Sequence, residues 1–160
     1  EVGDLPAAAL LAPMPMTGVG GMLGRLKQRH RVNTLLGFMK RQPYHWVRTP
    51  KLARELLVGP ANTLSDGELH GLVGPESIAI FEQLKGGIPL RAHVRELPMR
   101  VFAGDADACF ALDATREYAD ALGAELELFE GMGHDLMLEP CVEDLARRLD
   151  RWLVSDLGIE

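Results

Sequence analysis

The sequence predicts an α/β protein: a parallel sheet flanked by helices, with an inserted helical cap. From residue 99 onward the segments alternate strand, helix, strand, helix, an order typical of parallel strands joined by right-handed crossovers. Residues 22–87 instead contain short helical patterns broken by Gly and Pro. The chain has 160 residues, 47% of them hydrophobic and 25% charged, which is ordinary for one globular domain.

The first predicted element is a short buried strand at residues 7–13. This run is apolar without polar alternation, as in a parallel strand covered on both faces. Pro13 and Pro15 end it. The glycine-rich loop that follows, TGVGGMLG, does not match GxGxxG because position 23 is Leu, so we expect no phosphate cradle there.

Four short helices are predicted next. The first is amphipathic, with one apolar face formed by Val32, Leu35, Leu36 and Met39. A second surrounds Leu52–Leu57, a third covers GELHGLV after a cap at Ser65 or Asp66, and a fourth starts at Pro75 and stops at Gly86–Gly87. These interrupted helices suggest a cap without a core of its own, whose Phe38, Met39 and Phe81 line its contact with the sheet domain.

The last third supplies two further strands and two helices. Strands are predicted at residues 99–103 and 125–129, and a helix capped by Asp113 and ended by Gly123 lies between them. The strongest amphipathic helix of the chain covers residues 142–153.

Titratable side chains follow both late strands directly. Asp105 and Asp107 come after the strand at 99–103, and His134 comes after the strand at 125–129. In open parallel sheets, functional groups gather at the carboxyl ends of the strands. A carboxylate there can accept the Nδ1 proton of an imidazole and fix its tautomer, which leaves the other ring nitrogen to act as a base.

Four motifs in this order resemble the C-terminal part of the α/β-hydrolase superfamily: ALLAPMPMTG at residues 9–18, GDAD at 104–107, GMGHDLMLEP at 131–140 and RRLDRWL at 147–153. The resemblance implies that Asp107 is the triad acid and His134 the triad base, with Asp105 as the competing acid. It divides the chain into a core strand at 1–15, a helical cap at 16–97 and a C-terminal core half at 98–160.

The nucleophile that this family requires is missing from the sequence. Ser65, Ser77 and Ser155 are the only serines, and none lies in a G-x-S-x-G elbow. The resemblance therefore implies that the serine and the oxyanion hole precede this segment, and Glu1 in place of Met agrees with a truncated start. We expect a hydrolase of carboxylic esters, of the esterase, lipase or lysophospholipase kind, acting on a small ester or lipid-like molecule.

Two alternatives to this function stay open. Some relatives on the same fold use an aspartate nucleophile on haloalkanes or epoxides. The chain could also be a non-catalytic fragment, or the partner-binding half of a two-chain assembly in which a second chain carries the nucleophile. A three-stranded sheet with an open flank would favour such association.

Cys109 and Cys141 are the only cysteines and lack CxxC spacing, so we expect neither a zinc site nor another cofactor. Cys109, two residues from Asp107, is an alternative nucleophile, but a small buried hydrophobe is the favoured interpretation for both thiols. A disulfide between them is left open. Isolated cysteines, with no signal peptide or membrane span, favour a cytoplasmic location.

The charge is unevenly distributed along a chain whose net charge is -6. Residues 5–54 contain no Asp or Glu but nine basic residues. This basic stretch is either the solvated face of the cap helices or a surface that attracts an anionic substrate or a membrane. Nucleic acid is not expected, because the chain is acidic overall and only Tyr44 and Trp46 accompany the basic charges.

Overall fold

The computed structural model describes residues 5–89 and 96–159. The elements in chain order are β1 Ala8–Leu11, α1 Gly20–Arg29, α2 Arg31–Met39, the 3-10 turn η2 Pro43–Trp46, α3 Pro50–Leu57, α4 Asp66–Gly71, α5 Ile78–Leu84, β2 Met99–Gly104, α6 Leu112–Leu122, β3 Glu125–Phe129, the 3-10 turn η4 Leu136–Leu138, α7 Val142–Asp150 and the π-helical segment η5 Arg151–Asp156.

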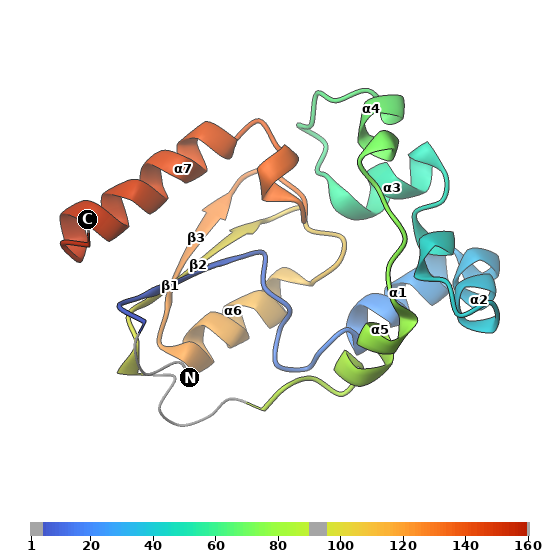
Figure 1. Ribbon diagram of the computed structural model, residues 1–160, viewed down its shortest axis with the longest axis horizontal. Helices are drawn as coiled ribbons and strands as arrows, with labels where there is room; N and C mark the ends of the chain where they lie inside the picture. The colour runs from blue at the N-terminus through green and yellow to red at the C-terminus, as the bar shows by residue number, and fades with distance from the viewer. Residues whose placement is uncertain (1–4, 90–95, 160) are drawn as a thin grey trace.

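The three strands form one parallel sheet in the order β1-β2-β3. Helix α6 lies on one face of this sheet and α7 on the other (Figure 1). The side chains of β2 alternate accordingly: Val101 packs with Ala119 of α6, whereas Phe102 packs with Leu145 of α7. The predicted α/β class with a parallel sheet flanked by helices is therefore confirmed.

Several element boundaries differ from the prediction. The first strand is shorter than expected, and it is half-buried rather than covered on both faces. Among the described residues it pairs with β2 only. Helix α5 begins at Ile78, so Pro75 does not start it. Asp113 lies inside the first turn of α6 and makes no capping bond. The regular part of the last helix ends at Asp150, before a π-helical turn.

Other local predictions are confirmed. Ser65 caps α4 through a complete capping box with Glu68, and Gly123 ends α6 in the left-handed conformation with φ 69°. The division into segments 1–15, 16–97 and 98–160 stays a prediction, since residues 1–4 and 90–95 lie outside the described part of the chain.

The helices α1–α5, which we call the cap, lie together at one end of the molecule (Figure 1). Contrary to expectation, α1, α5 and the turn η2 share a buried cluster that includes Trp46, with Leu56 of α3 packed against it. The Trp46 ring lies 5.0 Å from that of Phe81 in an edge-to-face arrangement. Cys109 and Phe110, from the loop after β2, complete this cluster. The cap therefore packs directly on the loop that carries Asp107.

Helix α2 has the opposite orientation to the one its apolar pattern predicts. Thr34 and Gly37 are buried. Of the predicted apolar face, Val32, Leu35 and Met39 are 70%, 59% and 72% exposed, and only Leu36 is half-buried. The cause is Trp46, whose indole fills the space over Gly37 and whose Nε1 donates to the Thr34 carbonyl at 3.5 Å. Only the face without bulky side chains can approach the ring.

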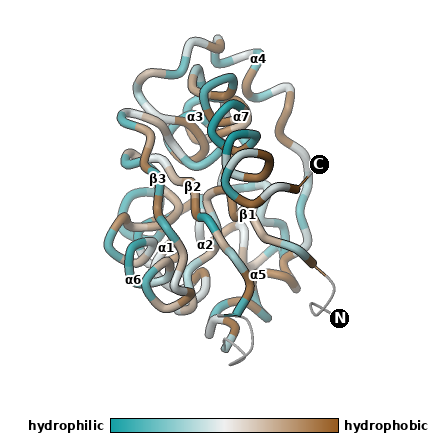
Figure 2. Tube along the Cα trace, turned by 90° about the vertical axis from the view of Figure 1, so that its left-hand side faces the viewer, coloured by the Kyte–Doolittle hydropathy of each residue, from teal (hydrophilic) through white to brown (hydrophobic). Residues whose placement is uncertain are grey.

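The expected lining of the cap–core contact is therefore wrong for Met39 and for Phe38, which is 39% exposed. Phe81 does pack against the buried cluster. Figure 2 shows how hydrophobic and hydrophilic stretches are distributed along the chain. Among the described residues, no helix has the length and apolar character that crossing a bilayer would require.

The packing of α2 predicts opposite effects for two helical glycines. A Cβ at Gly37 would overlap the Trp46 indole, whereas a Cβ at Gly24 of α1 would meet nothing within 4 Å. We expect Gly37→Ala to lower the free energy of unfolding by about 1–3 kcal/mol. Gly24→Ala should raise it by about 0.5–1 kcal/mol through helix propensity. Urea denaturation followed by circular dichroism measures both; equal effects would contradict the described contact.

Candidate active site

The structure brings Asp107 and His134 together at the carboxyl ends of β2 and β3. These strands are neighbours with Gly104 opposite Phe129, so the loops that follow them lie side by side. His134 Nδ1 is 3.0 Å from Asp107 Oδ2. The Asp107 side chain is 5% exposed and that of His134 is 27% exposed, so the pair is sheltered but the imidazole retains access to solvent.

The backbone of its own loop holds the Asp107 carboxylate in place. The amide groups of Cys109 and Phe110 donate to Oδ1 at 2.6 and 3.0 Å. With one oxygen occupied in this way, the other is directed at the imidazole and accepts its Nδ1 proton. His134 Nε2 then has no proton and is the nitrogen available as a base. The edge of the Phe110 ring packs against the imidazole at 5.3 Å.

Asp105, the competing acid, has a different role. Its Oδ1 accepts from the Gly131 amide at 2.7 Å. Two backbone bonds run beside it, from the Asp105 amide to the Phe129 carbonyl at 3.2 Å and from the Ala106 amide to the Met132 carbonyl at 3.0 Å. Asp105 therefore connects the loop after β2, which carries Asp107 (the acid loop), to the loop after β3, which carries His134 (the histidine loop). Asp107, not Asp105, is the partner of His134.

Sequence reasoning missed Glu139, the carboxylate that positions the histidine loop. It is 2% exposed. Its Oε1 accepts from the amides of Gly59 at 2.5 Å and Gly133 at 2.6 Å, and its Oε2 accepts from Asn62 Nδ2 at 3.0 Å. A buried charge is tolerated when such donors surround it. Only the three-dimensional structure reveals these donors, because two of them come from residues about 80 positions upstream.

The glycines at this contact allow the two backbones to touch. A Cβ on Gly133 would collide with the backbone of Val58 and Gly59, and one on Gly59 would collide with the Gly131 carbonyl. The Asp135 amide also donates to the Leu57 carbonyl at 2.8 Å. The segment between α3 and α4 is thus joined to both sides of His134.

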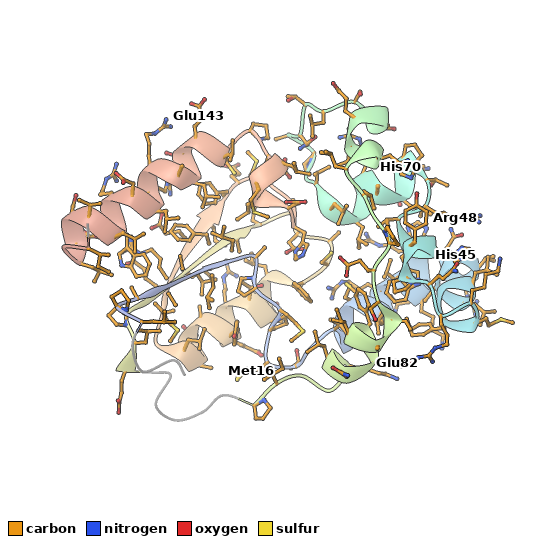
Figure 3. The ribbon with its side chains drawn as sticks, in the orientation of Figure 1. Met16, His45, Arg48, His70, Glu82 and Glu143 are labelled. Carbon is orange, nitrogen blue, oxygen red and sulfur yellow. The ribbon has the colours of Figure 1, made fainter. Side chains whose placement is uncertain are left out.

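A cavity of about 380 Å³ lies between the cap and His134. It is lined mainly by apolar side chains. Its cap side includes Trp46, Leu69 and Phe81, and His134 and Asp135 form part of its opposite wall. Figure 3 labels His70 on α4, His45 in the turn η2 and Arg48 just after that turn. The His70 imidazole lies 3.4 Å from the Tyr44 hydroxyl at the edge of this region. Burial raises the pKa of Asp135. The charge on His134 opposes this upward shift, and the Glu139 carboxylate adds to it.

Cys109 lies beside the pair but is not set up as a nucleophile. It is 3% exposed and its thiol donates to the Leu56 carbonyl at 3.4 Å. Burial raises the pKa of this thiol, and the neighbouring Asp107 charge raises it further. Cys141 is also a free, buried thiol, in the separate cluster around Phe102. The two cysteines do not form the disulfide that the sequence left open.

One group of metal-ligating side chains is present among the described residues. Single donor atoms of Asp107, Cys109 and His134 lie within 4.8 Å of one another. A metal at this position would need the Cys109 thiolate, which burial disfavours. It would also compete with the Asp107–His134 bond for the carboxylate. The geometry suits a carboxylate–imidazole pair better than a metal centre.

In the part of the chain that the structure describes, no serine or threonine lines the cavity. Ser65 is engaged with Glu68 at the start of α4, Ser77 precedes α5, and Ser155 lies in the C-terminal π-helical segment. Among the described residues, no serine or threonine hydroxyl therefore lies beside the Asp107–His134 pair.

No family model matches this chain, and no curated protein matches it. Its structure is similar to that of carboxylesterase CesB (YbfK) from Bacillus subtilis, with 16% identity, a TM-score of 0.47, and coverage of 90% of this chain and 50% of that chain. It is also similar to Est816, an N-acyl homoserine lactone degrading enzyme, with 19% identity, a TM-score of 0.48, and coverage of 89% and 57%.

The chain therefore spans about half the length of these two proteins. Within the chain itself, β2 and β3 are parallel neighbours, and the loops after them bring Asp107 and His134 together.

The contacts of Glu139 predict a large effect for an isosteric change. Glu139→Gln replaces one acceptor oxygen with an amino group, which must then face a backbone or Asn62 donor. We expect the free energy of unfolding to fall by about 1–3 kcal/mol. Glu130→Gln, on the exposed part of the same loop, should change it by less than about 0.5 kcal/mol. Guanidinium denaturation measures the free energy of unfolding of both variants. Equal values would contradict the stabilising role of the hydrogen bonds that Glu139 accepts.

The buried Cys109 thiol should resist alkylation. In the folded protein at about pH 8 we expect iodoacetamide to leave Cys109 unmodified, because its pKa is raised and it is inaccessible; in denaturant it should react fully. Met137→Cys, at a position 55% exposed, serves as the positive control. Peptide mapping by mass spectrometry gives the result, and modification of Cys109 as fast as position 137 would contradict this assignment.

Proposed function

We propose that this chain supplies the acid and the base of an α/β-hydrolase of carboxylic esters, and that the nucleophilic serine comes from outside these 160 residues. The observation that carries the proposal is the 3.0 Å contact between His134 Nδ1 and Asp107 Oδ2. The acid is fixed by its loop, and the imidazole borders a mostly apolar cavity under the cap. These are the features that general-base activation of a hydroxyl needs.

In the proposed reaction, His134 Nε2 takes the proton of the serine hydroxyl as the serine oxygen attacks the ester carbonyl. Asp107 stabilises the imidazolium that forms. The imidazolium then gives its proton to the departing alkoxide, which leaves an acyl-enzyme. A water molecule, deprotonated by the same nitrogen, attacks this acyl group and regenerates the serine and the free acid.

The open edge of β1 supports the proposed origin of the nucleophile. Within the described residues, β1 forms a ladder on one side only, with β2. Its outer edge leaves backbone donors and acceptors free to pair with a further strand. A strand and turn added there, by the same polypeptide or by a second chain, would extend the sheet on which Asp107 and His134 lie.

The cavity lining supports the proposed class of substrate. Leu72, Val73 and Phe81 offer apolar surface to an acyl or alkyl group. An esterase, lipase or lysophospholipase type of substrate, with an apolar portion beside its ester, is consistent with this lining. The cap would then select the size of that portion and exclude water from the reacting carbonyl.

An aspartate nucleophile acting on haloalkanes or epoxides is the second enzymatic candidate. The same pair favours it, because His134 would then activate the water that hydrolyses the alkyl-enzyme ester. A third candidate is a non-catalytic module that binds a partner through the β1 edge. The three candidates differ in which chain, if any, reacts with a serine-directed probe.

Fluorophosphonate labelling, read out by denaturing intact-mass spectrometry, distinguishes the serine hydrolase from the other two candidates. We expect a native sample to carry the adduct on a polypeptide that contains the serine, and the isolated 17.6 kDa chain to take none. Ester turnover by the isolated chain that His134→Ala abolishes would sink the proposal of an external nucleophile. If the native sample contains only the unlabelled 17.6 kDa chain, the non-catalytic module replaces the enzyme as the best account.

In an active sample, variants of the two acids should differ widely. Asp107→Asn should lower kcat by roughly 10⁴-fold, because the amide cannot stabilise the required tautomer and imidazolium. Asp105→Asn, which alters only the tie to Gly131, should leave kcat within about tenfold of the parent. Similar losses in both variants would contradict the assigned roles.

A further inference from the structure

The outward face of α2 carries an unusual concentration of apolar side chains. Val32, Leu35 and Met39 are 70%, 59% and 72% exposed, and they follow one stripe along the helix because their spacing is three, four and seven residues. The helix lies at the outer end of the cap, on the side away from the sheet (Figure 1). Its inward packing uses Thr34 and Gly37, so the apolar stripe takes no part in the cap's own packing.

A groove of about 510 Å³ continues this stripe between α1 and α2. Leu23, Leu35 and Phe38 supply its apolar lining, with glycines of α1. Basic side chains also border it: Lys27, Arg31 and Lys85. The apolar surface of the cap is thus surrounded by cationic groups.

These cations differ from the other basic residues of the cap. Arg41 pairs with Glu82, Arg54 pairs with Asp66, and Arg25 donates to the carbonyls of Ala108 and Cys109. In the described ranges, 5–89 and 96–159, no ion pair is formed by Lys27, Arg31, Lys40 or Lys85. A chain with a net charge of -6 therefore gathers uncompensated positive charge around one exposed apolar helix.

We propose that α2 and the adjoining groove form a docking surface for an anionic lipid bilayer. The helix lies in the interface with Val32, Leu35 and Met39 inserted at the level of the acyl chains. The surrounding lysine and arginine side chains reach the phosphate groups of the lipid heads. An amphipathic helix with large apolar side chains on one side and cations at its margins has the composition of interfacial helices.

Charge complementarity selects a bilayer over a second copy of this chain. The patch is cationic and acidic residues are absent from residues 5–54. A symmetric contact of this patch with itself would therefore bring like charges together. An anionic bilayer supplies both the apolar layer and the negative charge that the patch needs. This inference concerns the surface of the cap alone and does not depend on the proposed function.

The test is co-sedimentation of the 160-residue chain with phosphatidylcholine vesicles containing about 30% phosphatidylserine, beside vesicles of phosphatidylcholine alone. We expect binding to the anionic vesicles that falls steeply with salt. Val32→Ser with Leu35→Ser should weaken it about tenfold or more, and Lys27→Gln with Arg31→Gln should do the same.

Matched controls change the same residue types on α6, α7 and η5, outside the cap. Val142→Ser with Val154→Ser removes two apolar side chains that are 41% and 48% exposed, and Arg116→Gln with Arg147→Gln removes two exposed cations of α6 and α7. Neither should weaken vesicle binding by more than about twofold. Circular dichroism checks that every variant is folded.

Three outcomes would overturn the proposal. The parent chain could fail to bind anionic vesicles, or the α2 variants could bind as well as the controls, which would place the contact elsewhere. Light scattering could instead show that the parent chain is a dimer that Val32→Ser with Leu35→Ser dissociates without affecting vesicle binding. A second copy of the chain would then be the occupant of this surface.

Discussion

The buried carboxylate of Glu139 is the constraint on which the candidate site depends. Within residues 5–89 and 96–159 it forms no ion pair and is instead stabilised by three N–H donors, from Gly59, Asn62 and Gly133. A charge out of water requires all of these bonds at once, because losing one leaves its desolvation uncompensated. The requirement fixes the segment between α3 and α4 against the histidine loop, and the glycines there allow the close backbone contact.

This constraint determines how His134 presents its ring. The residue before it is bonded to Glu139 of its own loop, and the residue after it is bonded to Leu57 at the end of α3. The backbone on both sides of His134 is therefore fixed. The ring is fixed from the sheet side by Asp107. The imidazole is thereby oriented before any substrate arrives, with Nε2 as its free nitrogen, which is the condition for electrostatic preorganisation. Burial also raises the pKa of Asp135 beside it.

Features that depend on residues close together in the sequence could be predicted, and features that depend on residues far apart could not. The strands at residues 99–104 and 125–129, and the positions of Asp107 and His134 after them, depend on local pattern and on the rule for parallel strand ends, so they were predictable. Glu139 was not, because a glutamate is normally exposed and its donors lie far upstream. The orientation of α2 failed for another reason: periodicity locates an apolar face but does not say whether it turns inward. Trp46 decided that question by requiring the small face of Thr34 and Gly37.

Trp46 connects the two apolar surfaces of the cap. Large apolar side chains of the cap are divided between the cavity beside His134 and the outward stripe of α2, and Trp46 lies between them, contacting Phe81 on one side and Phe38 on the other. Burying the stripe inside the cap would require moving Trp46, which would open the cluster that supports Cys109 and Phe110 in the acid loop. The outward orientation of the α2 stripe is therefore coupled, through one indole, to the packing that holds Asp107 beside His134.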